Sequence, residues 1–201
     1  MDLPSGMDGW LSESIPGYRR LDQRLATGGC ITDRHIAVLA AAGFEVVINL
    51  LPDEAEGAWP GEGEIVRSLG MRYIAIPIVW ERPSLTDLRL FSACMAAHAG
   101  RKIFVHCAKN YRVSMFVALD RVLRLGWQTE RALRDAARVW KPDGVWRDFI
   151  VRALKTPARG GRRNRAGVPI KSKTATKGKK GKGTSNRSPT VRRVASRDER
   201  S

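Results

Sequence analysis

Cysteine is scarce in this chain of 201 residues, which contains only Cys30, Cys94 and Cys107. The number is odd and no two of them stand at a metal-ligand spacing, so the sequence argues against a disulfide framework and against a zinc site. Cys30 and Cys94 are most simply explained as small buried side chains. We therefore expect no bound metal, no cofactor, and reduced thiols of the kind found in cytoplasmic proteins.

Long apolar runs are also absent, and the first residues of the chain already carry Asp2, Asp8 and Glu13. A membrane-spanning helix needs roughly 20 predominantly apolar residues, and a signal peptide needs an apolar segment behind a basic start. The sequence shows neither pattern, so we expect a cytoplasmic protein without a transmembrane segment.

Acidic residues nearly disappear after residue 154. Residues 155–201 contain 16 Lys and Arg against 2 Asp and Glu, and so carry most of the formal net charge of +16. Ordering a residue costs roughly 1–2 kcal/mol in backbone entropy, which a segment with few large apolar residues cannot recover by burial. We predict a disordered basic tail over residues 156–201 that binds nucleic acid or anionic surfaces non-specifically. The alternative is a solvated tail without a partner, because no aromatic side chains interleave its charges.

The first 154 residues alternate between apolar strand candidates and amphipathic helix candidates. Strands are predicted at residues 25–29, 44–51, 71–77 and 103–105, and helices at residues 33–42, 63–69, 84–98, 115–125, 129–139 and 144–154. This alternation is typical of an α/β fold with a parallel-rich central sheet flanked by helices, here with a helical C-terminal half. We predict one domain over residues 22–155, preceded by an N-terminal extension of residues 1–21.

The most informative segment runs from Val105 to Ser114, because it places Cys107 between a buried strand and a helix. Backbone N–H groups at the start of a helix attract anions, so this turn favours both a bound phosphate and the ionised form of Cys107. Ligands of parallel sheets bind at the carboxyl ends of the strands, which is where Cys107 is expected. The segment therefore combines a nucleophile with an anion-binding loop.

Three segments in order, residues 43–50, 70–77 and 105–114, resemble the Cys-dependent protein tyrosine and dual-specificity phosphatases. Within that group they are most similar to a bacterial branch of small dual-specificity-like domains. The likeness spans roughly residues 22–150 and leaves the basic tail uncovered. It implies a phosphatase-like α/β fold and hydrolysis of phosphomonoesters through a cysteinyl-phosphate intermediate. The implied substrate is a phosphorylated protein or a small phosphoester.

The resemblance also implies a role for each residue of the loop. Cys107 attacks phosphorus, Arg112 binds the phosphate oxygens, and His106 orients the loop and supports the thiolate. Ser114 either hydrogen-bonds the cysteine sulfur and helps it leave in the second step, or caps the following helix. The remaining loop positions bind the phosphate: Ala108, Lys109, Asn110, Tyr111 and Val113.

The spacing within this loop departs from the usual pattern of the superfamily, in which five residues separate the cysteine from the arginine. Here Arg112 follows Cys107 after four residues, Val113 stands where arginine is usual, and Ser114 keeps its usual place. Either the loop is one residue tighter, or Arg112 reaches the phosphate from one position earlier. The shortened spacing itself resembles that of the bacterial branch.

The general acid that protonates the leaving oxygen is usually an Asp on a loop before the catalytic strand, but residues 78–84 contain no Asp. Glu81 is the first candidate for this role and Asp87 is the second. Positioned proton transfer is typically worth about 100- to 10,000-fold, so a missing acid would slow the departure of poor leaving groups most.

Two other functions fit the same turn. A rhodanese-like sulfurtransferase also has its cysteine at a strand-to-helix turn, can have the shorter loop, and would hold a persulfide on Cys107. A phosphate-binding protein without turnover is the third hypothesis, suggested by the displaced Arg112 and the uncertain acid. His106 and residues 48–50 and 76–77 favour the phosphatase.

Overall fold

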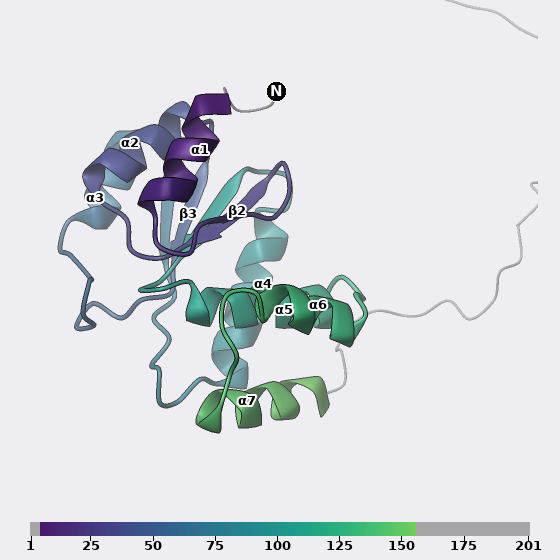
Figure 1. The fold of residues 1–201 in the computed structure, drawn as a ribbon. Coiled ribbons are helices and arrows are strands. Elements are labelled where there is room, and N and C mark those ends of the chain that lie inside the picture. Colours follow the sequence, from purple (N-terminus) through teal and green to yellow (C-terminus); the bar gives the residue numbers. More distant parts are fainter. Residues whose placement is uncertain (1–4, 156–201) are drawn as a thin grey trace, which may run out of the picture. The chain divides into compact units, whose positions relative to one another are not determined.

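The computed structural model describes residues 5–155, which form a five-stranded sheet with helices on both of its faces (Figure 1). The strands are β1 (Arg19–Arg20), β2 (Leu25–Gly28), β3 (Val46–Asn49), β4 (Arg72–Ala75) and β5 (Ile103–His106). The helices are α1 (Ser5–Ser14), α2 (Asp33–Ala41), α3 (Glu62–Ser68), α4 (Leu85–Ala97), α5 (Tyr111–Leu123), α6 (Thr129–Ala136) and α7 (Gly144–Lys155). The predicted tail, residues 156–201, lies outside the described residues.

The strand order is β1-β2-β5-β3-β4, and every neighbouring pair is parallel except the short edge pair β1 and β2. The predicted α/β fold with a parallel-rich sheet is therefore confirmed. β5 is the central strand, and Gly28 of β2 and Asn49 of β3 both stand in register with His106 at its end. Cys107 thus lies in the middle of the carboxyl edge of the sheet, where ligands of parallel sheets bind.

Alternate side chains of the central strands point into two apolar cores, one on each face of the sheet. The larger core receives Val46, Ile48 and Val105 from the strands and is completed by α4, α5 and α7, whose largest contributions are Phe91, Phe116, Trp146 and Phe149. The smaller core receives Val47 and Phe104 and is completed by α1, α2 and α3. β5 is therefore buried on both faces, which fixes the position of the loop that follows it. None of the helices within residues 5–155 is long and apolar enough to cross a membrane.

Residues 5–20, which the sequence assigned to an N-terminal extension of residues 1–21, pack against the rest of the fold. Leu11 and Ile15 are 0% and 2% exposed and pack into the smaller core. The sequence prediction missed α1 because its glycine and serine residues are weak helix formers and only a few apolar side chains mark its buried face.

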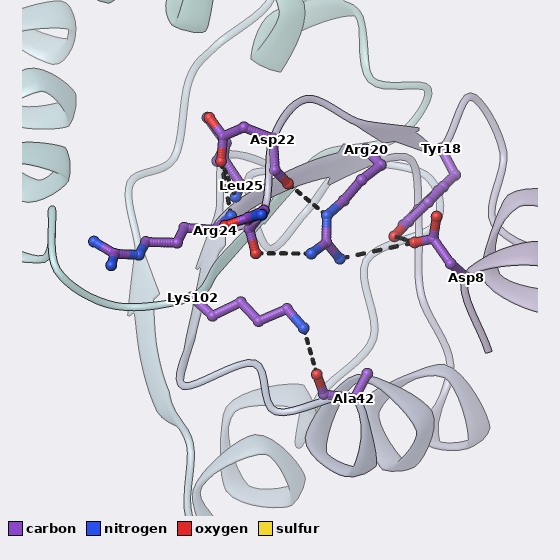
Figure 2. Close-up of polar contacts among 9 residues, drawn as sticks. Asp8, Tyr18, Arg20, Asp22, Arg24, Leu25, Ala42 and Lys102 are labelled. Carbon is purple, nitrogen blue, oxygen red and sulfur yellow. Dashed lines mark hydrogen bonds and ion pairs between the residues drawn. The ribbon is translucent and has the colours of Figure 1, made fainter. Parts of the chain in front are cut away.

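Polar contacts join α1 to the edge of the sheet (Figure 2). The Tyr18 hydroxyl donates a hydrogen bond of 2.6 Å to Asp8, and the guanidinium of Arg20 lies 3.8 Å from the same carboxylate. Burial, and after it the bond to Asp8, raises the pKa of Tyr18 above its usual value. On the same side of the sheet, the Lys102 ammonium donates to the carbonyl of Ala42 at the end of α2. The two contacts with Asp8 tie α1 to the segment that enters β1, whereas the Lys102 bond ties the end of α2 to the segment before β5.

Candidate active site

The loop after β5 turns sharply into α5, which begins at Tyr111 rather than at the predicted Met115. Asn110 makes this turn, and among the described residues it alone has a positive φ, 64°, without being glycine. Its buried side-chain amide donates to the Gly17 carbonyl at 2.7 Å and to the Thr27 hydroxyl at 2.9 Å. Asparagine tolerates this backbone better than most residues, so Asn110 both forms the turn and ties it to β2.

Cys107 stands at the base of the loop, and its side chain is completely buried. Its N–H group donates to the Gly28 carbonyl at 3.3 Å, one residue beyond the end of β5. The N–H groups of residues 108, 109 and 111–113 donate to no other residue in the described part of the chain. At the start of the 13-residue α5, such unpaired donors and the positive end of the helix dipole attract an anion. The loop therefore has the donors that an anion-binding site requires.

Arg112, the second residue of α5, lies against the loop that follows β4. Its Nε donates to the Ile78 carbonyl at 2.9 Å, and the guanidinium carbon is 5.3 Å from the centre of the Trp80 ring. Because Nε is occupied, the two terminal nitrogens are the part of the fork that remains for a phosphate. Val113, which stands where arginine is usual, is completely buried in the larger core, so only its N–H group can contact an anion.

His106 at the end of β5 is paired with Glu62 at the start of α3. The His106 Nε2 and the Glu62 Oε1 are 2.8 Å apart, and the two side chains are 1% and 6% exposed. The imidazole also stacks on Phe104, with ring centres 5.9 Å apart, while its buried Nδ1 has no hydrogen-bond partner among residues 5–155. Glu62 was not predicted, because it lies 44 positions from its partner and no local pattern marks the pair.

We expect Glu62→Ala to lower the free energy of unfolding by about 2 kcal/mol, because it leaves the buried imidazole of His106 without its charged partner. Glu62→Gln keeps an acceptor in place and should recover most of the loss. Glu64→Ala is the matched control, since Glu64 is exposed on the same helix. Urea unfolding of the three variants measures the difference. Equal stabilities of Glu62→Ala and Glu64→Ala would show that the pair contributes nothing.

Two further small side chains lie near the loop, those of Ser114 and Cys30. The Ser114 hydroxyl donates to the Tyr111 carbonyl at 2.9 Å, so it forms neither the bond to Cys107 nor the helix cap considered from the sequence. Cys30 has its N–H group bonded to the Ala108 carbonyl at 3.1 Å. Burial, and after it the nearby charge of Cys107, raises the pKa of the Cys30 thiol. Cys30 is therefore protonated at neutral pH although it lies beside the loop.

The two candidate acids differ in how their carboxylates are used. Asp87 belongs to the capping box of α4, in which it accepts from the Ser84 N–H at 3.2 Å and donates its own N–H to the Ser84 hydroxyl at 3.1 Å. Glu81 is exposed, and its carboxylate has no hydrogen bond or ion pair within residues 5–155. It follows Trp80, whose ring lies over Arg112. Glu81 is thus the candidate with a free carboxylate.

These features together define the class of protein. The site combines a buried cysteine after the central parallel strand, an arginine in the first turn of the next helix, and loop N–H groups that are unpaired within residues 5–155. This combination is that of a Cys-dependent, tyrosine-phosphatase-like domain. No three His, Cys, Asp or Glu side chains in the described residues are grouped to hold a metal ion. The chain belongs to the family of phosphatase-like domains of beta-lactamase hydrolase-like proteins, which matches it over residues 17–123.

Sequence relatives support this assignment. The beta-lactamase hydrolase-like protein of Agrobacterium fabrum is 31% identical over 107 residues, which are 52% of this chain and 25% of that protein. The corresponding protein of Xylella fastidiosa is 29% identical over 106 residues, which are 51% of this chain and 24% of that protein. The matched region therefore spans about a quarter of the length of these relatives.

The comparison with solved structures supports the same assignment. The DUF442 protein from Shewanella putrefaciens CN-32 is 30% identical to this chain, with a TM-score of 0.62 over 70% of this chain and 93% of that one. The active form of Tk-PTP is 21% identical and has a TM-score of 0.58 over 70% of this chain and 95% of that one, which is evidence for the fold alone. The resemblance inferred from the sequence is confirmed.

Proposed function

We propose that this domain hydrolyses phosphomonoesters through a cysteinyl-phosphate intermediate on Cys107. The observation that carries the proposal is the loop of residues 107–113, where a buried thiol, unpaired backbone donors and Arg112 meet at one strand-to-helix turn. Membership of a phosphatase-like family supports the same class of reaction. The substrate is a phosphorylated protein or a small phosphoester.

In the first step the phosphate binds to the loop N–H groups and to the terminal nitrogens of Arg112. The Cys107 thiolate attacks phosphorus in line, so that an S–P bond forms as the ester P–O bond breaks. The electron pair of the broken bond goes to the leaving oxygen, which takes a proton from Glu81. The loop donors stabilise the charge on the equatorial oxygens through the transition state.

In the second step water attacks the phosphorus of the intermediate and gives its proton to Glu81. The S–P bond breaks, inorganic phosphate is released and the Cys107 thiolate is restored. His106 does not touch the substrate in this scheme. It is a positioning residue, held by Glu62 at the base of the loop.

The test is phosphate release from p-nitrophenyl phosphate by the purified full chain in reducing buffer. We expect turnover of the ester, and we expect no thiocyanate from thiosulfate and cyanide. Thiocyanate formation that depends on Cys107, without phosphate release, would contradict the proposal in favour of the sulfurtransferase. Binding of inorganic phosphate without any turnover would contradict it in favour of the phosphate-binding protein.

We expect Glu81→Gln to lower kcat/KM about 100-fold for an alkyl phosphate but less than about tenfold for p-nitrophenyl phosphate, because only the alkoxide needs a proton to leave. Asp87→Asn is the comparison variant. Its carboxylate caps α4, so we expect a loss of stability of about 1 kcal/mol and equal rate changes on both substrates. Equal losses on both substrates in Glu81→Gln would exclude Glu81 as the acid.

A further inference from the structure

An open cavity of about 500 Å³ borders the phosphate-binding loop. Its wall includes Ala108, Lys109 and Tyr111 from the loop itself, together with residues 16–19 before and within β1 and residues 138–139 after α6. A molecule whose phosphate occupies the loop therefore has this cavity beside it. None of the described residues that line it is acidic.

Three cations line the cavity: Arg19, Lys109 and Arg138. In the part of the chain that the structure describes, none of the three is within ion-pair distance of a carboxylate. Basic residues nearby do have such partners, as Arg20 has Asp8. Three unpaired cations around one hollow, with Arg19 partly buried, create a positive potential that an anion would neutralise.

We propose that this cavity is a second anion subsite, which binds a further phosphate group of a small substrate whose scissile phosphate lies in the loop. The proposal rests on the proposed function, because both groups belong to one substrate. Arg19 and Arg138 provide planar forks that can donate paired hydrogen bonds to a phosphate, and Lys109, a loop residue that also lines the cavity, provides an ammonium. A single phosphotyrosine side chain has no second anion to place there. The preferred substrate is thus a small phosphomonoester that carries at least one more phosphate.

The test compares two probes, inorganic phosphate and inorganic tripolyphosphate, by isothermal titration calorimetry on the full chain carrying Cys107→Ser. The basic residues of 156–201 also attract tripolyphosphate, so only the binding that excess inorganic phosphate displaces is counted. The subsite variant adds Arg19→Gln and Arg138→Gln. The matched control adds Arg134→Gln and Arg147→Gln, which remove two exposed charges outside the cavity.

We expect the parent chain to bind tripolyphosphate at least about tenfold more tightly than phosphate, as charge-assisted hydrogen bonds at a second group allow. The subsite variant should lower this ratio about tenfold, and the control should leave it unchanged. If the ratio of the two affinities is the same in the parent chain, the subsite variant and the control, the subsite is overturned. If the subsite variant loses affinity equally for both probes while its melting temperature is unchanged, the two arginines contact the phosphate in the loop. This result would also overturn the subsite. If the double variant fails to fold, the exposed Arg138→Gln alone gives the same test, with a drop of about threefold expected.

The two proposals can fail separately, because this readout is binding and needs no turnover. If the ratio falls as expected but the wild-type chain hydrolyses no ester, the proposed function is refuted and the subsite is supported as a binding site. If the chain hydrolyses p-nitrophenyl phosphate and the ratio does not change, the subsite alone is refuted.

Discussion

The Cys107→Ser variant is expected to lose at least about 1000-fold in the hydrolysis of p-nitrophenyl phosphate, because the reaction loses the nucleophile on which both steps depend. A neutral serine hydroxyl attacks phosphorus far more slowly than a thiolate. Serine is close to cysteine in size and the Cys107 side chain is completely buried, so the loop should keep its shape. Binding of inorganic phosphate, measured by calorimetry, should therefore persist while initial rates collapse.

Cys94→Ser is the control for this change. Cys94 is a free, partly buried cysteine in α4, outside the loop, and it undergoes the same chemical replacement. We expect it to keep the wild-type rate. Equal rates for Cys107→Ser and Cys94→Ser would exclude a cysteinyl-phosphate mechanism.

The second large effect is expected at Arg112. The Arg112→Lys variant should lower kcat/KM for the same ester about 100- to 1000-fold, which is the usual cost of removing one preorganised donor from a developing anion. A lysine cannot form two parallel hydrogen bonds to a phosphate. It also lacks the Nε–H that donates to the Ile78 carbonyl at 2.9 Å and anchors the guanidinium. We expect kcat to fall as well as KM to rise, because the missing donors act in the transition state.

Arg121→Lys is the matched control, measured by the same steady-state kinetics. Arg121 is also a buried residue of α5, and its guanidinium lies 4.4 Å from the centre of an aromatic ring, that of Trp127. It therefore undergoes the same chemical change outside the loop, and its kcat/KM should stay near that of the wild type. If Arg112→Lys is as active as Arg121→Lys, the arginine of the shortened loop is not the phosphate ligand.

The fold could be predicted where the local pattern and the tertiary environment agree. Strands such as residues 103–105 are buried on both faces, so their apolar runs identify them without any partner, and β5 covers this range. The pattern failed for α1, whose buried face consists of a few apolar side chains such as Leu11 and Ile15 among weak helix formers. It also placed the start of α5 too late, because Asn110 completes the turn with a left-handed backbone that the apolar spacing does not encode.

The residues of the candidate site also divide into those that a local sequence pattern identifies and those that it does not. The loop from His106 to Ser114 is local, so its residues could be named from the sequence. The pairing of His106 with Glu62 could not, because it depends on where the tertiary fold places the first residue of α3. Asp87 is a different case, since the Ser84–Asp87 spacing is that of a capping box and could have assigned this carboxylate to the start of α4.

The central claim is that phosphate is transferred to Cys107. Rapid acid quenching of the wild-type chain during turnover of p-nitrophenyl phosphate, followed by peptide mass spectrometry, tests it most directly. We predict one phosphoryl group on the peptide that contains Cys107, appearing with the first burst of nitrophenol and absent from Cys107→Ser. If the wild-type chain releases nitrophenol but this peptide carries no phosphoryl group, the mechanism is contradicted.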